Sequence, residues 1–231
     1  MAPSPETRLR ELQAVLFDLD GTLIDTVELI RLSMRHATLE VLGASPPDGV
    51  LMSGVGMPLL TQFRDLAPEH ADDLLRVFRE FNHAHHDDIA KAYPGTLDVL
   101  GELRSRGIRM GIVTSKGEVA ATMGIDKFGL RGFAEIIVTA DDVEIHKPDP
   151  YPLAYAATLL NVDLRYCVYV GDSPHDMLAA VSGGAISVAA LWGAFPAAEV
   201  LAPGPDFALS GIRELPALLA GETERFTARR S

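Results

Sequence analysis

The segment AVLFDLDGT, residues 14–22, constrains the fold of this chain more than any other part of the sequence. It begins with a continuous apolar run, which is typical of a buried strand, and Asp18 and Asp20 follow at once. Residues two apart near a strand end can point to the same side. Burying two unpaired carboxylates would cost on the order of several kcal/mol each. The segment therefore predicts a buried strand that ends where other groups compensate negative charge.

Short apolar runs rich in Val and Ile recur along the chain, as expected for strands covered on both faces. These runs are 14–17, 111–114, 135–139, 167–170 and 186–190, with 206–209 as a sixth candidate. Helical patterns between them cover 95–106, 117–127, 150–160, 174–183 and 212–219. Strand–helix alternation predicts right-handed crossovers and an α/β fold with a doubly wound parallel sheet.

Residues 26–92 interrupt this alternation. They contain no convincing strand, and Pro- and Gly-containing breaks separate helical patterns over 27–42, about 58–66 and 69–91. We expect a helical cap domain, residues 26–92, inserted into a core domain of residues 1–25 and 93–231. Such an insertion would lie over the carboxyl end of the first strand, where open α/β sheets bind ligands, and could act as a lid.

Composition narrows the classes of partner. The 231 residues carry a net charge of −12 and no Lys/Arg-rich run, which argues against nucleic acid. The single cysteine, Cys167, excludes an internal disulfide and fits a reducing compartment. There is neither an apolar signal core nor a run of membrane-span length, so we expect a cytoplasmic protein without a membrane partner. We expect it to be a monomer or a dimer. The polar tail GETERFTARRS is expected to fray.

A second acidic cluster, Asp172 and Asp176 in GDSPHD, follows the apolar run 167–170. Two acidic strand ends in one parallel sheet predict a site shared with Asp18 and Asp20. Four carboxylates would repel one another unless a cation joined them, and oxygen-only ligands favour Mg²⁺. The alternatives are a plain Asp-Gly turn for the first pair and helix N-capping for the second.

Two further strand ends carry groups that suit a phosphate. GIVTSK ends in Thr114 and Ser115, whose hydroxyls and backbone N–H groups can form an anion cradle at a helix start. Lys147 follows the next strand and can balance a nucleophilic carboxylate and a phosphate, although a solvated surface lysine is the alternative. Gly21 permits a tight turn with free N–H groups. Lys116 is expected to be exposed in a first helical turn, without a role. Together these groups indicate phosphoryl transfer.

The motifs DLDGT, VTS, KPDP and GDSPHD, in this order, resemble the four motifs of the haloacid dehalogenase-like (HAD) phosphohydrolases over about residues 13–211. The resemblance implies that Asp18 is the nucleophile, which forms an aspartyl-phosphate. It implies that Asp20 is the general acid and then the general base. It also implies that Thr114 and the Ser115 backbone hold the transferring phosphoryl group.

The same resemblance implies a further set of roles around Asp18. Lys147 would orient Asp18 and stabilise charge, and Mg²⁺ would be bound by Asp18, the carbonyl oxygen of Asp20 and Asp172. Asp176 would be a partner of the metal-bound waters or of Lys147. The insertion corresponds to the helical cap of the subfamily that places its cap directly after the first motif.

Substrate choice is expected to lie in the cap, and the substrate to be small and phosphorylated. The chain as a whole is similar to phosphoglycolate phosphatases. The cap stretch FNHAHHDD, with GIVTSK and VTADDVEIHKPDP, is closer to bacterial inorganic pyrophosphatases of the same superfamily, which carry Asn where Ser173 stands here. The resemblance favours pyrophosphate over phosphoglycolate. A β-phosphoglucomutase-type phosphotransferase and a non-catalytic phosphate-binding protein share the same core and stay open.

A pyrophosphate substrate would require cations or donors from the cap to hold its second phosphate. The candidates by charge alone are His83, His85, His86, Arg64 and Lys91. The histidine-rich turn could instead be structural or bind a metal. The loop GVGMP is either a plain interhelical loop or a cap loop that reaches the active site through Gly56. Trp192 is expected either to shape the pocket rim or to pack in the core.

Overall fold

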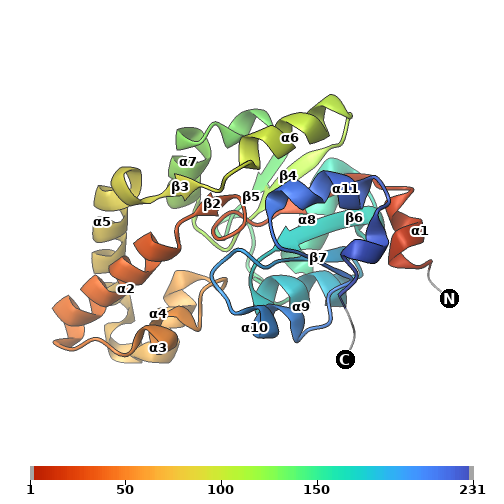
Figure 1. The fold of residues 1–231 in the computed structure, drawn as a ribbon. Coiled ribbons are helices and arrows are strands. Elements are labelled where there is room, and N and C mark those ends of the chain that lie inside the picture. The colour runs from red at the N-terminus through yellow and green to blue at the C-terminus, as the bar shows by residue number, and fades with distance from the viewer. Residues whose placement is uncertain (1–2, 229–231) are drawn as a thin grey trace.

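The computed structural model describes residues 3–228 and contains a six-stranded parallel sheet with helices on both faces (Figure 1). The strands lie in the order β5-β4-β1-β6-β7-β8. They are β1 (Ala14–Phe17), β4 (Met110–Val113), β5 (Ile136–Val138), β6 (Cys167–Gly171), β7 (Ile186–Ala190) and β8 (Phe207–Leu209). All six predicted strands are present, and the predicted doubly wound α/β fold is confirmed.

The central strand β1 shows why the chain folds this way. Its side chains alternate between two apolar clusters, with Val15 and Phe17 on one face and Ala14 and Leu16 on the other. Helices α6 (Thr96–Ser105), α7 (Glu118–Lys127) and α11 (Leu215–Leu219) cover the first face, and α8 (Tyr151–Leu160) and α9 (Pro174–Gly183) cover the second. Because both faces are covered, the strand appears in the sequence as an unbroken apolar run.

The helices that follow the strands agree with the predicted ranges, with one difference in type. They are α6 (Thr96–Ser105), α7 (Glu118–Lys127), α8 (Tyr151–Leu160), α9 (Pro174–Gly183) and α11 (Leu215–Leu219). A further helix after β7, α10 (Ala197–Leu201), was not predicted. The expected helix 212–219 begins as a 3-10 turn, Ile212–Glu214, and becomes α-helical only around Pro216. Proline favours the first turn of a helix, because it lacks an N–H group there. A short helix α1 (Pro5–Leu9) precedes the sheet.

Residues 26–92, called here the helical insertion, form a group of helices at the end of the sheet away from both termini (Figure 1). The helices are α2 (Val27–Leu42), α3 (Asp48–Met52), α4 (Leu59–Leu66) and α5 (Ala71–Ile89). They pack around an apolar cluster of their own, which includes Met34, Phe63 and Leu74. No helix within residues 3–228 has the length and apolar character that crossing a membrane requires.

The expectation that residues 26–92 hold no strand is wrong at one point. The strand β3 (Lys91–Ala92) pairs antiparallel with β2 (Ile24–Asp25), so the chain enters and leaves the helical insertion along a two-stranded ribbon. Strands of two residues are too short to show an alternating pattern, which is why the sequence did not reveal them.

The C-terminal tail is packed as far as residue 228, which corrects the expectation that it frays. Phe226 is 5% exposed in the cluster beneath α6 and α11, and its carbonyl accepts a hydrogen bond from the Ala208 N–H at 2.8 Å. Thr227 forms an antiparallel bridge with Phe207. A single phenylalanine among polar residues thus anchors a segment that covers the edge of β8. The rest of the tail, 229–231, lies outside the described residues.

Replacing Phe226 tests whether this anchoring is real. Phe226→Ala should lower the free energy of unfolding by about 3 kcal/mol, because it removes a buried aromatic ring and leaves a cavity. The measurement is urea unfolding followed by circular dichroism. Glu224→Ala, at an exposed position of the same tail, is the control and should unfold like the unmodified protein. Equal midpoints for the two variants would mean that the tail contributes nothing to the core.

Candidate active site

A buried lysine lies at the centre of the candidate site. The Lys147 ammonium donates to Asp18 Oδ1 at 3.0 Å, to Asp176 Oδ1 at 2.6 Å and to the Tyr169 hydroxyl at 2.9 Å. Lys147 is 3% exposed, so the alternative of a solvated surface lysine is wrong. Asp18 directly follows β1, and its N–H continues the sheet by donating to the Val170 carbonyl at 2.9 Å. The sheet backbone therefore holds Asp18 in place while Lys147 partly compensates its charge.

The charges in this network are unevenly compensated. Burial raises the pKa of Asp18 well above its ordinary value; Lys147 opposes the rise, and the neighbouring carboxylates add to it. Burial also acts on Asp176, but the charge and hydrogen bond of Lys147 outweigh it and lower the pKa of Asp176. Burial and the charge of Asp176 raise the pKa of Asp172 to about 7. The ionised forms of Asp18 and Asp172 are thus disfavoured, and a cation beside them would stabilise these forms.

The acidic groups suit a divalent metal ion. Within residues 3–228, only Asp18, Asp172 and Asp176 form a group of three potential ligands, with buried oxygens within 4.8 Å of one another. Asp172 is held by the Thr22 hydroxyl at 3.1 Å and the Ala194 N–H at 2.7 Å. An all-carboxylate set with excess negative charge fits a hard cation such as Mg²⁺.

Glycine is required where the chain turns beside this group. Gly21 has a φ of +77°, in the left-handed region that favours glycine, and a Cβ there would collide with the Asp172 carboxylate. The Asp-Gly turn therefore brings the backbone of residues 20–22 directly against Asp172. The alternative in which this turn is a plain connection between elements does not explain that contact.

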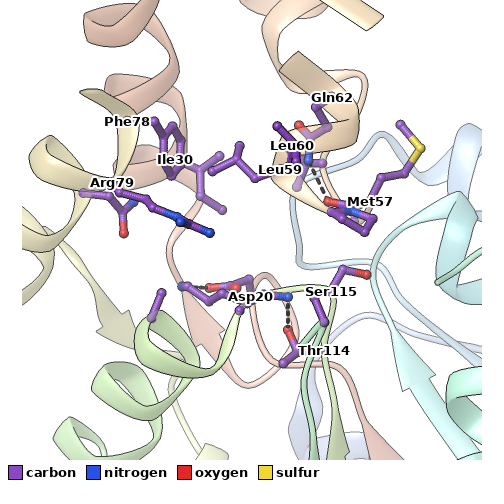
Figure 2. A pocket seen from close by; sticks show the side chains of 18 of the residues that line it. Asp20, Ile30, Met57, Leu59, Leu60, Gln62, Phe78, Arg79, Thr114 and Ser115 are labelled. Atoms are coloured by element: carbon purple, nitrogen blue, oxygen red, sulfur yellow. Dashed lines mark hydrogen bonds and ion pairs between the residues drawn. The ribbon is translucent and has the colours of Figure 1, made fainter. Parts of the chain in front are cut away.

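Asp20 lies in a different environment from Asp18. Its Oδ1 accepts hydrogen bonds from the Thr26 hydroxyl at 2.6 Å and from the Lys116 ammonium at 2.8 Å. Lys116 was expected to be exposed and without a role, but its side chain is 13% exposed and forms this ion pair. The physical reason is that α7 begins only at Glu118, so Lys116 stays in the loop at the sheet edge. Figure 2 shows Asp20 beside Thr114 and Ser115 on the floor of a pocket.

The predicted anion cradle lies on the neighbouring strand. β4 pairs with β1, and Thr114 extends β4 by one residue, its N–H donating to the Val138 carbonyl at 2.9 Å. The Thr114 hydroxyl oxygen accepts from the Lys116 N–H at 3.2 Å, which shapes the turn into α7. Sheet pairing therefore brings Thr114 and Ser115 to the same edge as Asp18.

Asp176 takes part in a helix cap and, at the same time, in an ion pair with Lys147. Its N–H donates to the Ser173 hydroxyl at 3.1 Å, while its Oδ2 accepts from the Ser173 N–H at 3.1 Å, which forms a capping box at the start of α9. Its other oxygen accepts from Lys147. The capping alternative is therefore correct for Asp176, and so is the predicted contact with Lys147.

A cavity of about 590 Å³ lies between this sheet edge and the helical insertion (Figure 2). Its polar floor, at the sheet edge, is formed by Asp18, Asp20, Thr114, Ser115, Lys116, Asp172 and Ser173. Its apolar wall, from the helical insertion, is formed by Ile30, Met34, Val55, Met57, Leu59, Leu60, Leu75 and Phe78. Gly56 also lines it, with a φ of +97° and no room for a Cβ, which would lie 2.8 Å from Ser173 Oγ.

Only one of the five predicted cap cations lines this cavity. His83 lines it, whereas the other four candidates do not. His85 stacks on Phe81 at 4.1 Å between ring centroids, and His86 is 1% exposed with Nδ1 3.1 Å from Asp87. The remaining two, Arg64 and Lys91, are exposed.

Arg79 was missed by the sequence analysis, and it lines the cavity one helical turn before His83 (Figure 2). The four-residue spacing from His83 is the signal that could have found it, because residues i and i+4 share a helix face. Trp192 packs against the main core cluster, and its Nε1–H donates to the Thr22 carbonyl at 3.1 Å, which favours the packing interpretation.

Comparison with known proteins agrees with this arrangement. The family model of the haloacid dehalogenase-like hydrolases matches residues 15–190. Pyrophosphatase PpaX of Bacillus pumilus is 35% identical over 211 residues, which cover 91% of this chain and 98% of that protein. The structure of a hydrolase from Pseudomonas syringae superposes with a TM-score of 0.82 at 25% identity, over 91% of this chain and 99% of the other.

A protein from Haemophilus somnus described as a predicted phosphoglycolate phosphatase has the same fold, with a TM-score of 0.78 at 22% identity over 90% of this chain and 98% of the other. The doubly wound parallel sheet, with its carboxylates gathered at one edge, and the family match together identify the chain as a hydrolase. The chain belongs to the haloacid dehalogenase-like hydrolase family, and within that family it is a phosphatase.

Removing the central lysine should unbalance the buried charges. Lys147→Met should lower the free energy of unfolding by about 3–5 kcal/mol, since it leaves Asp18 and Asp176 buried without a cation. Guanidinium unfolding in metal-free buffer measures the effect. Lys91→Met, at an exposed lysine, is the matched control. If the two variants proved equally stable, the ion network would be irrelevant to folding.

Proposed function

We propose that the protein is a Mg²⁺-dependent phosphohydrolase that acts through an aspartyl-phosphate on Asp18. The observation that carries the proposal is the contrast between two carboxylates only two residues apart. Both line the cavity, but Asp18 is buried and pairs with Lys147, whereas Asp20 is less buried and lies between Thr26 and Lys116. One is placed to attack, and the other to exchange protons with a group in the cavity.

In the first half-reaction, an Asp18 carboxylate oxygen attacks phosphorus and the bond to the leaving oxygen breaks. Thr114, the Ser115 backbone and Lys147 hold the phosphoryl oxygens, with the turn at Gly21 beside them, and Asp20 gives its proton to the leaving oxygen. In the second half-reaction, Asp20 takes a proton from water, and the resulting hydroxide displaces phosphate from Asp18. Thr26 and Lys116 are positioned to orient the Asp20 carboxylate in both steps.

Asp18, Asp172 and the Asp20 carbonyl oxygen would hold the Mg²⁺, with Asp176 supporting the site through Lys147 and Ser173. When bound, Mg²⁺ supplies Lewis-acid charge stabilisation to the phosphoryl oxygens and neutralises the excess carboxylate charge. We assign residues 26–92 the role of a cap that closes the cavity, with Gly56 on the loop that touches Ser173.

Inorganic pyrophosphate is the substrate we favour. The support is the 35% identity to the PpaX pyrophosphatase over nearly the whole chain, together with Arg79 and His83 on the cavity wall. Burial and the charges of Arg79, Lys116 and His86 lower the pKa of His83, so it faces the cavity as a neutral donor near pH 7. Arg79 can pair with the second phosphate of pyrophosphate. 2-Phosphoglycolate is the alternative, because its carboxylate could use the same arginine.

The nucleophile and the metal can be tested together. Asp18→Asn should abolish phosphate release, and EDTA should silence the unmodified enzyme until excess Mg²⁺ restores it. Asp172→Asn should retain activity only at Mg²⁺ concentrations about 10–100-fold higher, because one carboxylate ligand is lost. Phosphate release against free Mg²⁺ is the measurement. Full turnover by Asp18→Asn, or turnover that persists in EDTA, would contradict the proposed chemistry.

The substrate assignment is tested at Arg79. With the unmodified enzyme, kcat/KM for pyrophosphate should exceed that for 2-phosphoglycolate at least about tenfold, which corresponds to about 1.4 kcal/mol. Arg79→Met should lower kcat/KM for pyrophosphate about 10–100-fold, the range expected for loss of a charged hydrogen bond. Arg76→Met on the exposed face of α5, where Arg76 pairs with Asp73 and Glu80, is the control. A preference for 2-phosphoglycolate would replace the assignment and leave the core chemistry intact.

A further inference from the structure

Tyr169 is a fully buried tyrosine to which the proposed chemistry gives no role. It lies on β6 opposite Leu16 of β1, and it is 0% exposed. Its ring packs in the apolar cluster on the side of the sheet that α8 and α9 cover. Phenylalanine would fill the same space without bringing into the core a hydroxyl that needs a partner there. The hydroxyl is therefore the part of Tyr169 that packing does not explain.

The hydroxyl contacts both members of a buried ion pair. It accepts from the Lys147 ammonium at 2.9 Å and donates to Asp176 Oδ1 at 2.9 Å. Lys147 itself donates to the same Asp176 oxygen at 2.6 Å. The Val113 carbonyl, at 3.2 Å, is a more distant and uncharged acceptor for the hydroxyl proton, and a hydrogen bond to a carboxylate is the stronger one. Lys147, Tyr169 and Asp176 thus form a closed triangle of hydrogen bonds.

This triangle determines where the remaining N–H of the lysine points. An ammonium has three N–H donors, and two of those on Lys147 point into the triangle. The third points to Asp18 Oδ1 at 3.0 Å. Without the hydroxyl, one N–H would keep only a long contact to the Val113 carbonyl, at 3.5 Å. The ammonium would then be free to rotate and to shift relative to Asp18.

The surroundings keep Tyr169 a neutral hydroxyl that acts at a distance from the substrate. Burial and the charges of Asp176 and Asp18 raise the pKa of Tyr169 well above its ordinary value, so the hydroxyl retains its proton. Among the described residues that line the cavity, Asp18 is present and Tyr169 is not. An effect of the hydroxyl on a bound substrate must therefore pass through Lys147 and Asp18.

We propose that Tyr169 is a positioning residue for the reaction, because its hydroxyl fixes the Lys147 ammonium in the orientation that directs one N–H to Asp18. The hydroxyl gains and loses no proton, and no covalent bond to it forms or breaks. Holding the ammonium keeps the Asp18 carboxylate aligned for attack on phosphorus, and small displacements of a nucleophile are costly in rate. The proposal rests on Asp18 as the proposed nucleophile and is independent of which phosphate compound is the substrate.

Tyr169→Phe tests the proposal, because it removes the hydroxyl and keeps the ring. At saturating Mg²⁺ it should lower kcat about 10–100-fold and change KM less than about twofold, as for a group that supports the reacting atoms and does not bind substrate. The factor in kcat should be the same for pyrophosphate and 2-phosphoglycolate. Tyr155→Phe, at a partly buried tyrosine of the same apolar cluster, is the matched control and should keep kcat. An unchanged kcat in Tyr169→Phe, or a loss confined to KM, would overturn the proposal.

A spectroscopic measurement separates positioning from a general loss of stability. Lysine labelled with ¹⁵N at Nζ gives an ammonium NMR signal only where its protons exchange slowly with water, as in a buried hydrogen-bonded group. Lys147 should give such a signal in the unmodified protein, identified by a nuclear Overhauser contact with the Tyr169 ring. The signal should shift or broaden in Tyr169→Phe and stay unchanged in Tyr155→Phe. An identical signal in Tyr169→Phe would overturn the proposal even if kcat fell.

A second replacement covers the case in which Tyr169→Phe folds poorly. Incorporation of 3-fluorotyrosine at position 169 keeps the ring and the hydroxyl but weakens the hydroxyl oxygen as an acceptor for Lys147. It should lower kcat by a smaller factor than the loss of the hydroxyl, whereas 3-fluorotyrosine at position 155 should leave kcat unchanged. Equal kcat values for the two labelled proteins would overturn the proposal.

The outcomes separate this proposal from the one on which it rests. If Asp18→Asn turns over substrate as fast as the unmodified enzyme does, the proposed nucleophile is wrong and this proposal fails with it. If turnover depends on Asp18 but Tyr169→Phe keeps the full kcat, only the role of Tyr169 is wrong.

Discussion

The structure depends on the neutralisation of carboxylates that the fold buries at one edge of its sheet. Lys147 reaches that edge from the loop after β5, Asp18 from the end of β1 and Asp176 from the first turn of α9. The three groups meet only because β4 and β6 flank β1 in the sheet. The strand order therefore determines both the geometry of the site and the stability of its buried charges. An unpaired ion here would cost several kcal/mol, on the order of 3–5.

Environment separates two carboxylates that the sequence places two residues apart. Asp18 is enclosed, and burial raises its pKa, which disfavours its anionic form. Lys147 stabilises that anion, and a bound cation would stabilise it further. Asp20 keeps access to the cavity and is held from the side by Thr26 and Lys116. The same residue type thereby occupies two different environments, which is what the proposed roles of nucleophile and general acid require.

The elements that were predicted correctly are those whose signal lies within a short stretch of sequence. β1 is a continuous apolar run because both of its faces are covered, and the acidic strand ends followed from motif order. The failures have non-local causes. Lys116 is only partly exposed because α7 starts two residues after it, and Phe226 anchors a polar tail because β8 lies beside it. Arg79 has no motif of its own and gains significance only when α5 is placed over the sheet edge.

The same distinction separates reaction from substrate. The residues to which we assign the reaction lie at strand ends that sheet pairing holds, so their geometry depends on backbone hydrogen bonds such as that from Asp18 to Val170. The cavity wall belongs to helices whose placement depends on a two-residue ribbon, β2 and β3, and on their own apolar packing. Residues of a wall supported in this way can be substituted without disturbing the floor of the cavity. Under the proposed chemistry, a substitution at Arg79 or His83 on α5 would therefore shift substrate preference while the Asp18–Lys147 pair stays in place.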